Sequence, residues 1–193
     1  MTRIAALLLI SFLSLNSSSA QSEKAIRAGF EKYQNLIKEG DLKASMDYIY
    51  PKLFTVVPKD QMLNTLKSTM ENPMMEIKFG DLSITDVQKA KKVGSEYFAI
   101  LKYKTSMQLK LKAQSPEMAK MMNQQLMTGF TQKYGAENVS LDEASGFFTV
   151  KLSETAVAVS NDGKSNWTYL SLQEGQEQLM AQILPQEIFS QIK

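Results

Sequence analysis

The fold is decided by residues 25–54, which read AIRAGFEKYQNLIKEGDLKASMDYIYPKLF. The first half of this stretch repeats apolar side chains at spacings of four, three and four residues, which is typical of one buried face of a helix. These side chains are Ile26, Phe30, Tyr33 and Ile37. Gly40 predicts a left-handed C-terminal cap, and Asp41 predicts the N-cap of a second helix. The stretch therefore predicts two tightly joined helices, the second reaching Leu53 with an interruption at Pro51.

The pattern changes from helical to extended at Met75, after a predicted helix over residues 58–70 that stops at Asn72-Pro73. The strongest strand pattern runs from Tyr97 to Leu111, with mostly apolar side chains at odd positions and, from Lys102 onward, lysine or polar side chains at even positions. Such alternation predicts an antiparallel sheet with one buried and one solvated face. Because the run is unusually long for a straight strand, we expect a bend or bulge near Thr105.

The second half of the chain adds one helix, further strands and a helical tail. Ser115-Pro116 predicts the start of an extra helix over residues 116–134. Strand patterns follow at residues 139–141, 147–152, 156–159 and 167–172, and a helical pattern resumes after residue 174. Helices followed by antiparallel strands are the α+β order. We therefore predict a single α+β domain over residues 21–193, with N-terminal helices packed on a curved antiparallel sheet.

The first twenty residues are typical of a signal peptide. Arg3 precedes an apolar run that ends in Ser17-Ser18-Ser19-Ala20, and the run is shorter than the roughly 20 apolar residues that cross a bilayer. We expect cleavage after Ala20 and export to the periplasm or the extracellular space, without a membrane-spanning segment.

Composition excludes several classes of chemistry. The chain has neither cysteine nor histidine, which rules out disulfide scaffolds, Ser-His-Asp and Cys-His nucleophiles and ordinary zinc sites. The net charge is only +2, and Arg27 is the one arginine after the predicted signal peptide. Bidentate recognition of phosphates and guanines relies on arginine. We predict no nucleic-acid partner, no metal site and no cofactor.

The chain resembles the NTF2-like, cystatin-like cone superfamily, in the form of an exported bacterial member. Three features carry the resemblance: the Gly40-Asp41 break followed by Tyr50-Pro51, the helix that ends at Asn72-Pro73, and Trp167-Thr168-Tyr169-Leu170 near the end. The resemblance implies a cone-shaped cavity and a homodimer formed through the sheet. It also implies an acid-base enzyme as one alternative, in which tyrosines such as Tyr48 and a base such as Asp47 or Asp81 would face the cavity.

The candidate pocket residues come from the helices and the long strand. They are Phe30, Tyr33, Met46, Tyr97, Tyr103, Met118, Met122 and Phe130. The methionines of residues 118–122 would favour an apolar ligand or partner, with thioether binding of Cu(I) as the alternative. The lysines at even positions of the long strand, such as Lys102 and Lys104, would form either a solubilising face or an anion-binding strip.

Three functions fit these features. The first is a non-enzymatic binding or interaction domain for an apolar small molecule or a protein partner, which requires no catalytic group. The second is an isomerase or lyase that uses a carboxylate and a tyrosine. The third is a structural or assembly protein. An empty cavity with an inward carboxylate beside an inward tyrosine would favour the enzyme, whereas a cavity plugged by Met118, Met122 and Phe130 would oppose both the enzyme and the small-molecule ligand.

Overall fold

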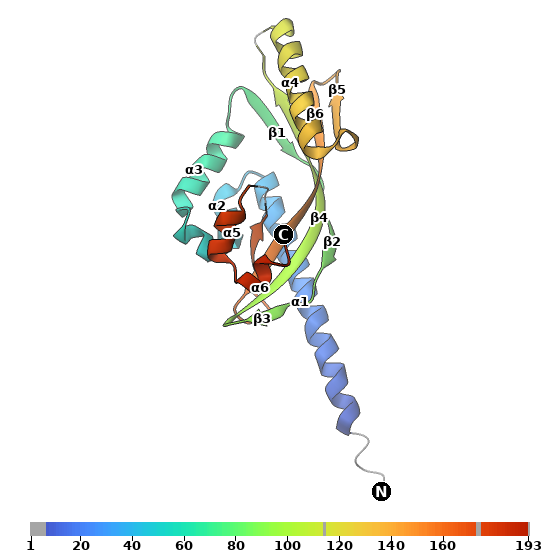
Figure 1. The fold of residues 1–193 in the computed structure, drawn as a ribbon, viewed down its shortest axis with the longest axis vertical. Coiled ribbons are helices and arrows are strands. Elements are labelled where there is room, and N and C mark those ends of the chain that lie inside the picture. Colours follow the sequence, from blue (N-terminus) through green and yellow to red (C-terminus); the bar gives the residue numbers. More distant parts are fainter. Residues whose placement is uncertain (1–6, 114, 173–174, 193) are drawn as a thin grey trace.

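The structure is a computed structural model that describes residues 7–113, 115–172 and 175–192, with side chains in the first helix described from Ser19 onward. The helices are α1 (Leu7–Lys38), α2 (Leu42–Ser45), α3 (Lys59–Met70), α4 (Pro116–Tyr134), α5 (Glu177–Ile183) and α6 (Gln186–Phe189). The strands are β1 (Met75–Phe79), β2 (Ser83–Val87), β3 (Lys91–Val93), β4 (Glu96–Leu111), β5 (Val139–Asp142), β6 (Phe147–Ser160) and β7 (Thr168–Ser171). The α+β prediction, including the extra helix and the helical tail, is confirmed (Figure 1).

The break after α1 forms as predicted, but the second helix is much shorter than predicted. Gly40 has a φ of +80°, which glycine adopts without strain, and the Asp41 carboxylate accepts a hydrogen bond from the N–H of Ala44 at 3.1 Å. After α2 the chain passes through two 3₁₀ turns, η1 (Met46–Tyr48) and η2 (Pro51–Thr55). Between them Tyr50 is extended, because a residue before proline disfavours helical geometry, and its N–H bonds the carbonyl of Tyr169 at 3.1 Å.

Two long strands, β4 and β6, form the centre of the sheet. They pair antiparallel from Tyr97 opposite Ser160 to Leu109 opposite Phe148 without a register shift. β6 is therefore one strand where the sequence predicts two. The irregularity expected near Thr105 falls on the neighbouring edge instead: β1 gives way to β2 there, and the N–H of Gly80 bonds the carbonyl of Ser106 at 2.8 Å.

The short strands line both outer sides of this pair. β1, β2 and β3 pair in turn with β4, while β5 and β7 pair with opposite ends of β6, and the described residues thus form a seven-stranded antiparallel sheet. Residues 96–104 of β4, with β2, β3 and β7, belong to what we call the α1 half. Residues 105–111, with β1 and β5, belong to the α4 half.

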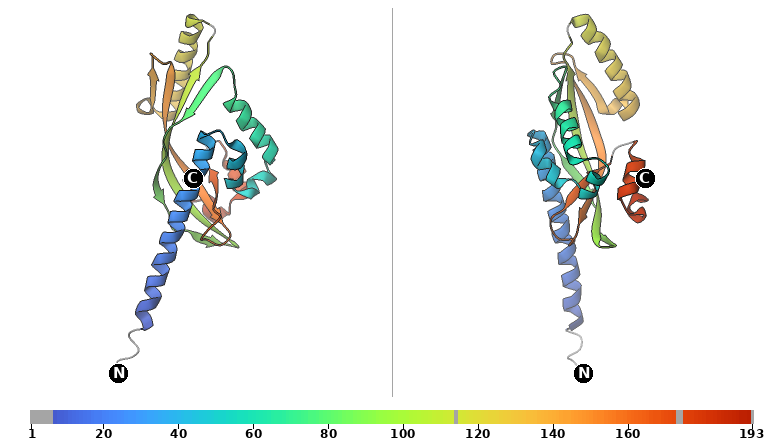
Figure 2. Two further views of the ribbon diagram at one scale, coloured as in Figure 1. Left: turned by 180° about the vertical axis from the view of Figure 1, so that it is seen from behind. Right: turned by 90° about the vertical axis from the view of Figure 1, so that its left-hand side faces the viewer.

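The α1 half is covered on both faces. α1 lies on the face that carries Leu101 and Tyr103, here named the α1 face, and α5 and α6 lie on the opposite face (Figure 2). The prediction that the even-numbered face of β4 is solvated is therefore wrong at Phe98 and Ile100, which are buried. The C-terminal tail covers this end of that face, and an ion pair between Lys91 and Glu187 joins β3 to α6.

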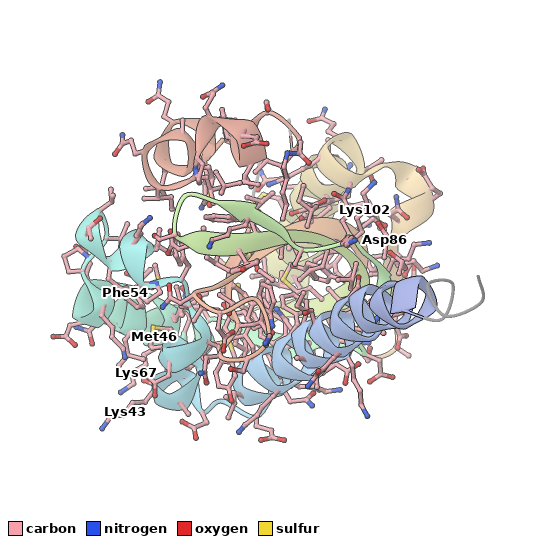
Figure 3. All side chains as sticks on the ribbon, turned by 90° about the horizontal axis from the view of Figure 1, so that it is seen from below. Lys43, Met46, Phe54, Lys67, Asp86 and Lys102 are labelled. Atoms are coloured by element: carbon pink, nitrogen blue, oxygen red, sulfur yellow. The ribbon has the colours of Figure 1, made fainter. Side chains whose placement is uncertain are left out.

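The α4 half has a thinner core. Leu109, Phe148 and Val150 are its buried side chains. α4 packs over them on the face that carries the odd-numbered side chains of β4, which is the continuation of the α1 face. The described side chains of α3 and α4 include no buried residue. Figure 3 shows buried and exposed side chains near α3: Met46 of η1 points inward, while Lys43 of α2 and Lys67 of α3 point to solvent. Within the described ranges, no helix combines the length and apolarity needed to cross a bilayer.

Candidate functional site

Four of the predicted pocket residues lie together in the core of the α1 half. Phe30, Tyr33, Met46 and Tyr103 are all buried and belong to one hydrophobic cluster. The ring of Phe30 lies 4.9 Å from that of Tyr103 and 5.2 Å from that of Tyr169, both edge-on. Edge-to-face contacts at these distances are the packing of a filled core. These side chains thus contact one another at the place where the resemblance implies a cavity.

The buried tyrosines have perturbed hydroxyl groups. Burial raises the pKa of Tyr33 to about 12, and neighbouring Tyr103 adds to the rise. Burial also raises the pKa of Tyr103, while its hydrogen bond with Ser171 opposes the rise. The Tyr169 hydroxyl donates to the carbonyl of Ile26 at 2.9 Å, and burial raises its pKa. All three hydroxyls are therefore held neutral at physiological pH.

A carboxylate that the sequence analysis missed lies beside this cluster. Glu154 stands directly opposite Tyr103 across the β4–β6 pair, so both side chains emerge on the α1 face. Burial raises the pKa of Glu154, and the charge of Lys133 opposes the rise. By contrast, the predicted bases Asp47 and Asp81 are exposed and form ion pairs with Lys59 and Lys38. The sequence pattern predicts two strands, residues 147–152 and 156–159, and Glu154 lies between them. It therefore does not show that Glu154 and Ala156 lie on the same face of one strand.

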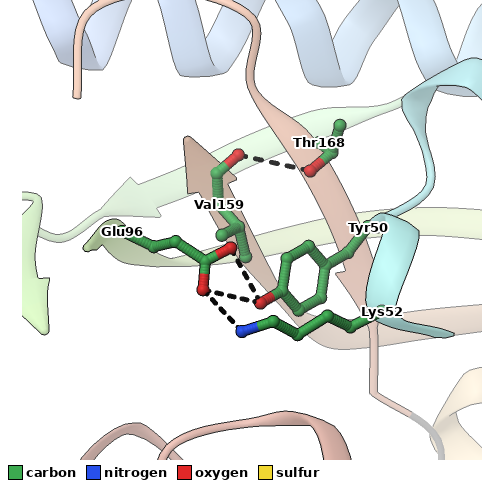
Figure 4. Close-up of polar contacts among 5 residues, drawn as sticks. All are labelled: Tyr50, Lys52, Glu96, Val159 and Thr168. Carbon is green, nitrogen blue, oxygen red and sulfur yellow. Dashed lines mark hydrogen bonds and ion pairs between the residues drawn. The ribbon is translucent and has the colours of Figure 1, made fainter. Parts of the chain in front are cut away.

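A second polar cluster joins the turn η2 to the start of β4. The buried Tyr50 hydroxyl donates to both carboxylate oxygens of Glu96, at 3.1 and 3.0 Å, and Lys52 donates to one of them at 2.7 Å (Figure 4). The hydrogen bond to Glu96 raises the pKa of Lys52. Nearby, the Thr168 hydroxyl donates to the carbonyl of Val159 at 3.3 Å. Every oxygen of the Glu96 carboxylate has a partner here, so the cluster attaches η2 to the sheet.

The remaining pocket candidates are divided between two other places. Tyr97 is half-buried and lines a small hollow of about 190 Å³ with Ser22 and Gly163. Met118, Met122 and Phe130 lie on α4, where the Phe130 ring contacts that of Phe148 at 5.9 Å. Phe148 pairs with Leu109, six residues along β4 from Tyr103, so the α4 group lies about 20 Å from the core tyrosines.

α4 carries two exposed methionines, Met118 and Met121, and we call the surface that they form the α4 surface. Met118 and Met121 are 40% and 57% exposed, although methionine is usually buried. A groove of about 620 Å³ lies between α4 and the β5–β6 hairpin, and it is lined by Met127, Leu141 and Gly146 among others. Among the described residues, no group of three or more Asp or Glu side chains is placed to hold a metal ion.

The lysines of β4 project from the sheet as predicted. Lys102 and Lys104 are exposed, and Figure 3 shows Lys102 beside Asp86, its register partner on β2. Lys78 and Lys110 flank the ring of Phe147 on the same face, at 4.1 and 5.6 Å from its centroid. We name this solvated surface, which runs from Lys102 along the rest of β4 and onto β1 and β6, the lysine face.

Comparison with known proteins gives no further assignment. No family model, no curated protein and no solved structure matches the chain.

Proposed function

We propose that the protein is an exported, non-enzymatic interaction domain of the NTF2-like type, and that it binds a protein partner at the α4 end of its sheet. Helices that precede an antiparallel sheet support the NTF2-like assignment. Export is supported by the sequence pattern of residues 1–20. Ser22, two residues after the expected cleavage site, is buried and donates to the carbonyl of Gly163 at 2.6 Å. Cleavage after Ala20 would leave that contact in place.

The distribution of exposed apolar side chains carries the proposal. In the described part of the chain, the large hydrophobic side chains that are exposed are Val56, Met74, Met118 and Met121. The last two lie on α4, and Met74 lies directly before β1, where its carbonyl accepts a hydrogen bond from the N–H of Lys112. Flexible thioether side chains suit a surface that adapts to another protein. The small-molecule alternative loses support because the predicted pocket residues Phe30, Tyr33, Met46 and Tyr103 contact one another.

A photo-crosslinking experiment tests this function. A photoreactive amino acid replaces Met121 on the α4 surface or, as the matched control, Lys67 on the exposed side of α3. Both positions are exposed and lie on helices, so they differ mainly in location. After irradiation in the native host, we expect one adduct of discrete mass from position 121 and none from position 67. Equal adducts from both positions, or none from either, would reject binding at the α4 end.

The acid-base alternative rests on one observation, the pairing of Tyr103 with Glu154 on the α1 face. A neutral tyrosine beside a carboxyl group of raised pKa is the combination that proton transfer requires. The catalytic role would demand that a bound small molecule reach both groups. Native mass spectrometry of the protein from its host tests this: a retained small molecule that is lost in Glu154→Gln supports the enzyme, and its retention in that variant opposes it.

A further inference from the structure

The outer edge of β1 has no strand partner among the described residues. β1 lies outermost on its side of the sheet and pairs only with β4 in the part of the chain that the structure describes. An open strand edge presents unpaired backbone groups, which fit the backbone of another extended segment. The direction of each β1 backbone group therefore decides what this edge can bind.

Two backbone hydrogen bonds fix that direction. The N–H of Lys112 bonds the carbonyl of Met74 at 2.9 Å, and the N–H of Gly80 bonds the carbonyl of Ser106 at 2.8 Å. In an antiparallel pair, residues alternate between those that bond across the pair and those whose N–H and C=O point away from it. Even-numbered residues of β1 thus bond to β4. The N–H and C=O groups of Ile77 and Phe79 point to the open side.

Two other edges of the sheet are occupied. On β7, the carbonyl of Tyr169 accepts a hydrogen bond from the N–H of Tyr50. On β2, the carbonyl of Ile84 accepts one from the Arg27 guanidinium at 3.0 Å, at the point where the register of β2 is irregular. Arg27 and the extended residues before Pro51 therefore block these edges to a further strand. β1 has no such block within the described chain.

Hollows lie at both ends of the β1 edge. One of about 660 Å³ adjoins Met75 and is lined by uncharged polar side chains of α3 and the turn after it. These are Gln61, Asn64, Thr65, Ser68, Thr69 and Asn72. The other, of about 330 Å³, adjoins Phe79 and is lined by residues of α1 and the β1–β2 turn, including Gln34, Asn35 and Lys38. A segment added to β1 has room to continue past both ends and meets polar side chains there.

The two faces beside β1 specify the chemistry of an added strand. Ile77 and the odd-numbered residues on either side of it, Met75 and Phe79, are half-buried on the face that continues the α1 face. They therefore favour apolar side chains on that side of an added strand. On the other side, the lysine face presents Lys78 of β1 and Lys110 of β4 beside this edge. Glu76 of β1 lies on the same face and pairs with Lys78 at 3.0 Å, so positive charge is in excess there. That excess favours acidic side chains in the partner.

We propose that the partner binds as an extended peptide segment, with alternating apolar and acidic side chains, that adds a strand to the open edge of β1. The proposal rests on the proposed function and names the form in which the partner docks. The backbone supplies the affinity through Ile77 and Phe79, and the two faces supply the specificity.

A displayed library of random dodecapeptides, selected on the full chain without its signal peptide, tests the proposal. Ile77→Pro removes an N–H that makes no bond to β4, and proline is tolerated at such edge positions. Ile77→Ala, the matched control, removes the side chain but keeps the N–H. For the selected peptides, we expect binding to be weakened on the order of tenfold or more in the proline variant relative to the alanine variant. We also expect the selected sequences to alternate apolar and acidic residues.

Amide hydrogen exchange on the wild-type chain keeps the test decisive if the proline variant does not fold. Added peptide should protect the amides of Ile77 and Phe79, which exchange rapidly without it, whereas those of Glu76 and Lys78 are protected throughout. Protection at β5 instead, equal binding to both variants or no selected peptide would overturn the proposal. A dimer of this chain that forms in Ile77→Ala but not in Ile77→Pro would also overturn it. A crosslink from position 121 without protection of β1 would reject the added strand and keep the proposed function.

Discussion

The two halves of the sheet share strands β4 and β6 but differ in how they are covered. In the α1 half, helices lie on both faces and side chains such as Phe30, Leu101 and Ala158 are fully buried. In the α4 half, one helix covers one face, the other face is solvated, and the described side chains of α4 are at most half-buried. The α1 half therefore holds most of the hydrophobic stabilisation, while the α4 half carries the exposed methionines, most of the lysine face and the open edge of β1.

Continuous pairing of β4 with β6 supports the α4 half, which has the smaller core. The strands stay in register across both halves, so the α1 half holds the far end of the sheet in place although few side chains are buried there. Apolar surface that would be buried in a thicker core is left for contacts with another molecule. The difference teaches that burial, more than residue type, separates the structural aromatic residues from the candidate binding residues here.

Truncation of one phenylalanine in each half gives the largest expected contrast. Phe30→Ala removes a ring packed against Tyr103 and Tyr169 and should lower the free energy of unfolding by about 3 to 5 kcal/mol. Phe130→Ala removes a half-buried ring that contacts Phe148, and about 1 to 2 kcal/mol should be lost. Urea titrations followed by circular dichroism measure both. Equal losses would mean that α4 contributes to the main core as much as α1 does.

The sequence predicts the elements better than it predicts the site. The break at Gly40, the helix over residues 116–134 and the alternation of β4 depend on local geometry, which short patterns record. The burial of Phe98 and Ile100 depends on α5 and α6, whose docking no local pattern records. The same reason explains the four candidate residues in the core: an apolar helix face predicts burial, but it does not distinguish a filled core from the wall of a cavity.

The carboxylates show the same limit. Asp47 and Asp81, the bases that the resemblance suggests, both pair with lysines at the surface. Glu154 and Glu96 reach tyrosines through strand pairing and a long-range contact, with no neighbouring motif. The resemblance to the NTF2-like superfamily remains a prediction.

Alkaline unfolding should single out the α1 half. The pKa of Tyr33 is raised from 10.0 to about 12, so between these values the unfolded chain loses the Tyr33 proton and the folded chain keeps it. Stability from this group is full below pH 10 and falls as pH rises toward 12, by roughly 2 to 3 kcal/mol. In Tyr33→Phe, we expect the loss of stability between pH 10 and 12 to be smaller by that amount. Tyr134→Phe, on α4, is the matched control, and an identical change in both variants would contradict the assignment.

One glycine in a helix of each half gives the smallest effects, but they have opposite signs. A Cβ at Gly29 of α1 would lie 2.3 Å from the Tyr169 hydroxyl, which is fixed by its bond to Ile26. Gly29→Ala should therefore lower the free energy of unfolding by about 1 to 2 kcal/mol, even after the gain in helix propensity. At Gly129 of α4, a Cβ meets no atom within 4 Å, so Gly129→Ala should raise it by about 0.5 to 1 kcal/mol.

A double-mutant cycle shows whether the hydroxyl contact is the cause. Tyr169→Phe alone loses the bond to Ile26 and should be destabilising, but in combination with Gly29→Ala it also removes the clashing oxygen. The combined loss in thermal or urea unfolding should therefore be clearly smaller than the sum of the single losses. Additive losses would place the strain elsewhere in the α1 half. Destabilisation by Gly129→Ala would show that the outer side of α4 is more tightly packed than its exposure indicates, and would weaken the distinction between the two halves.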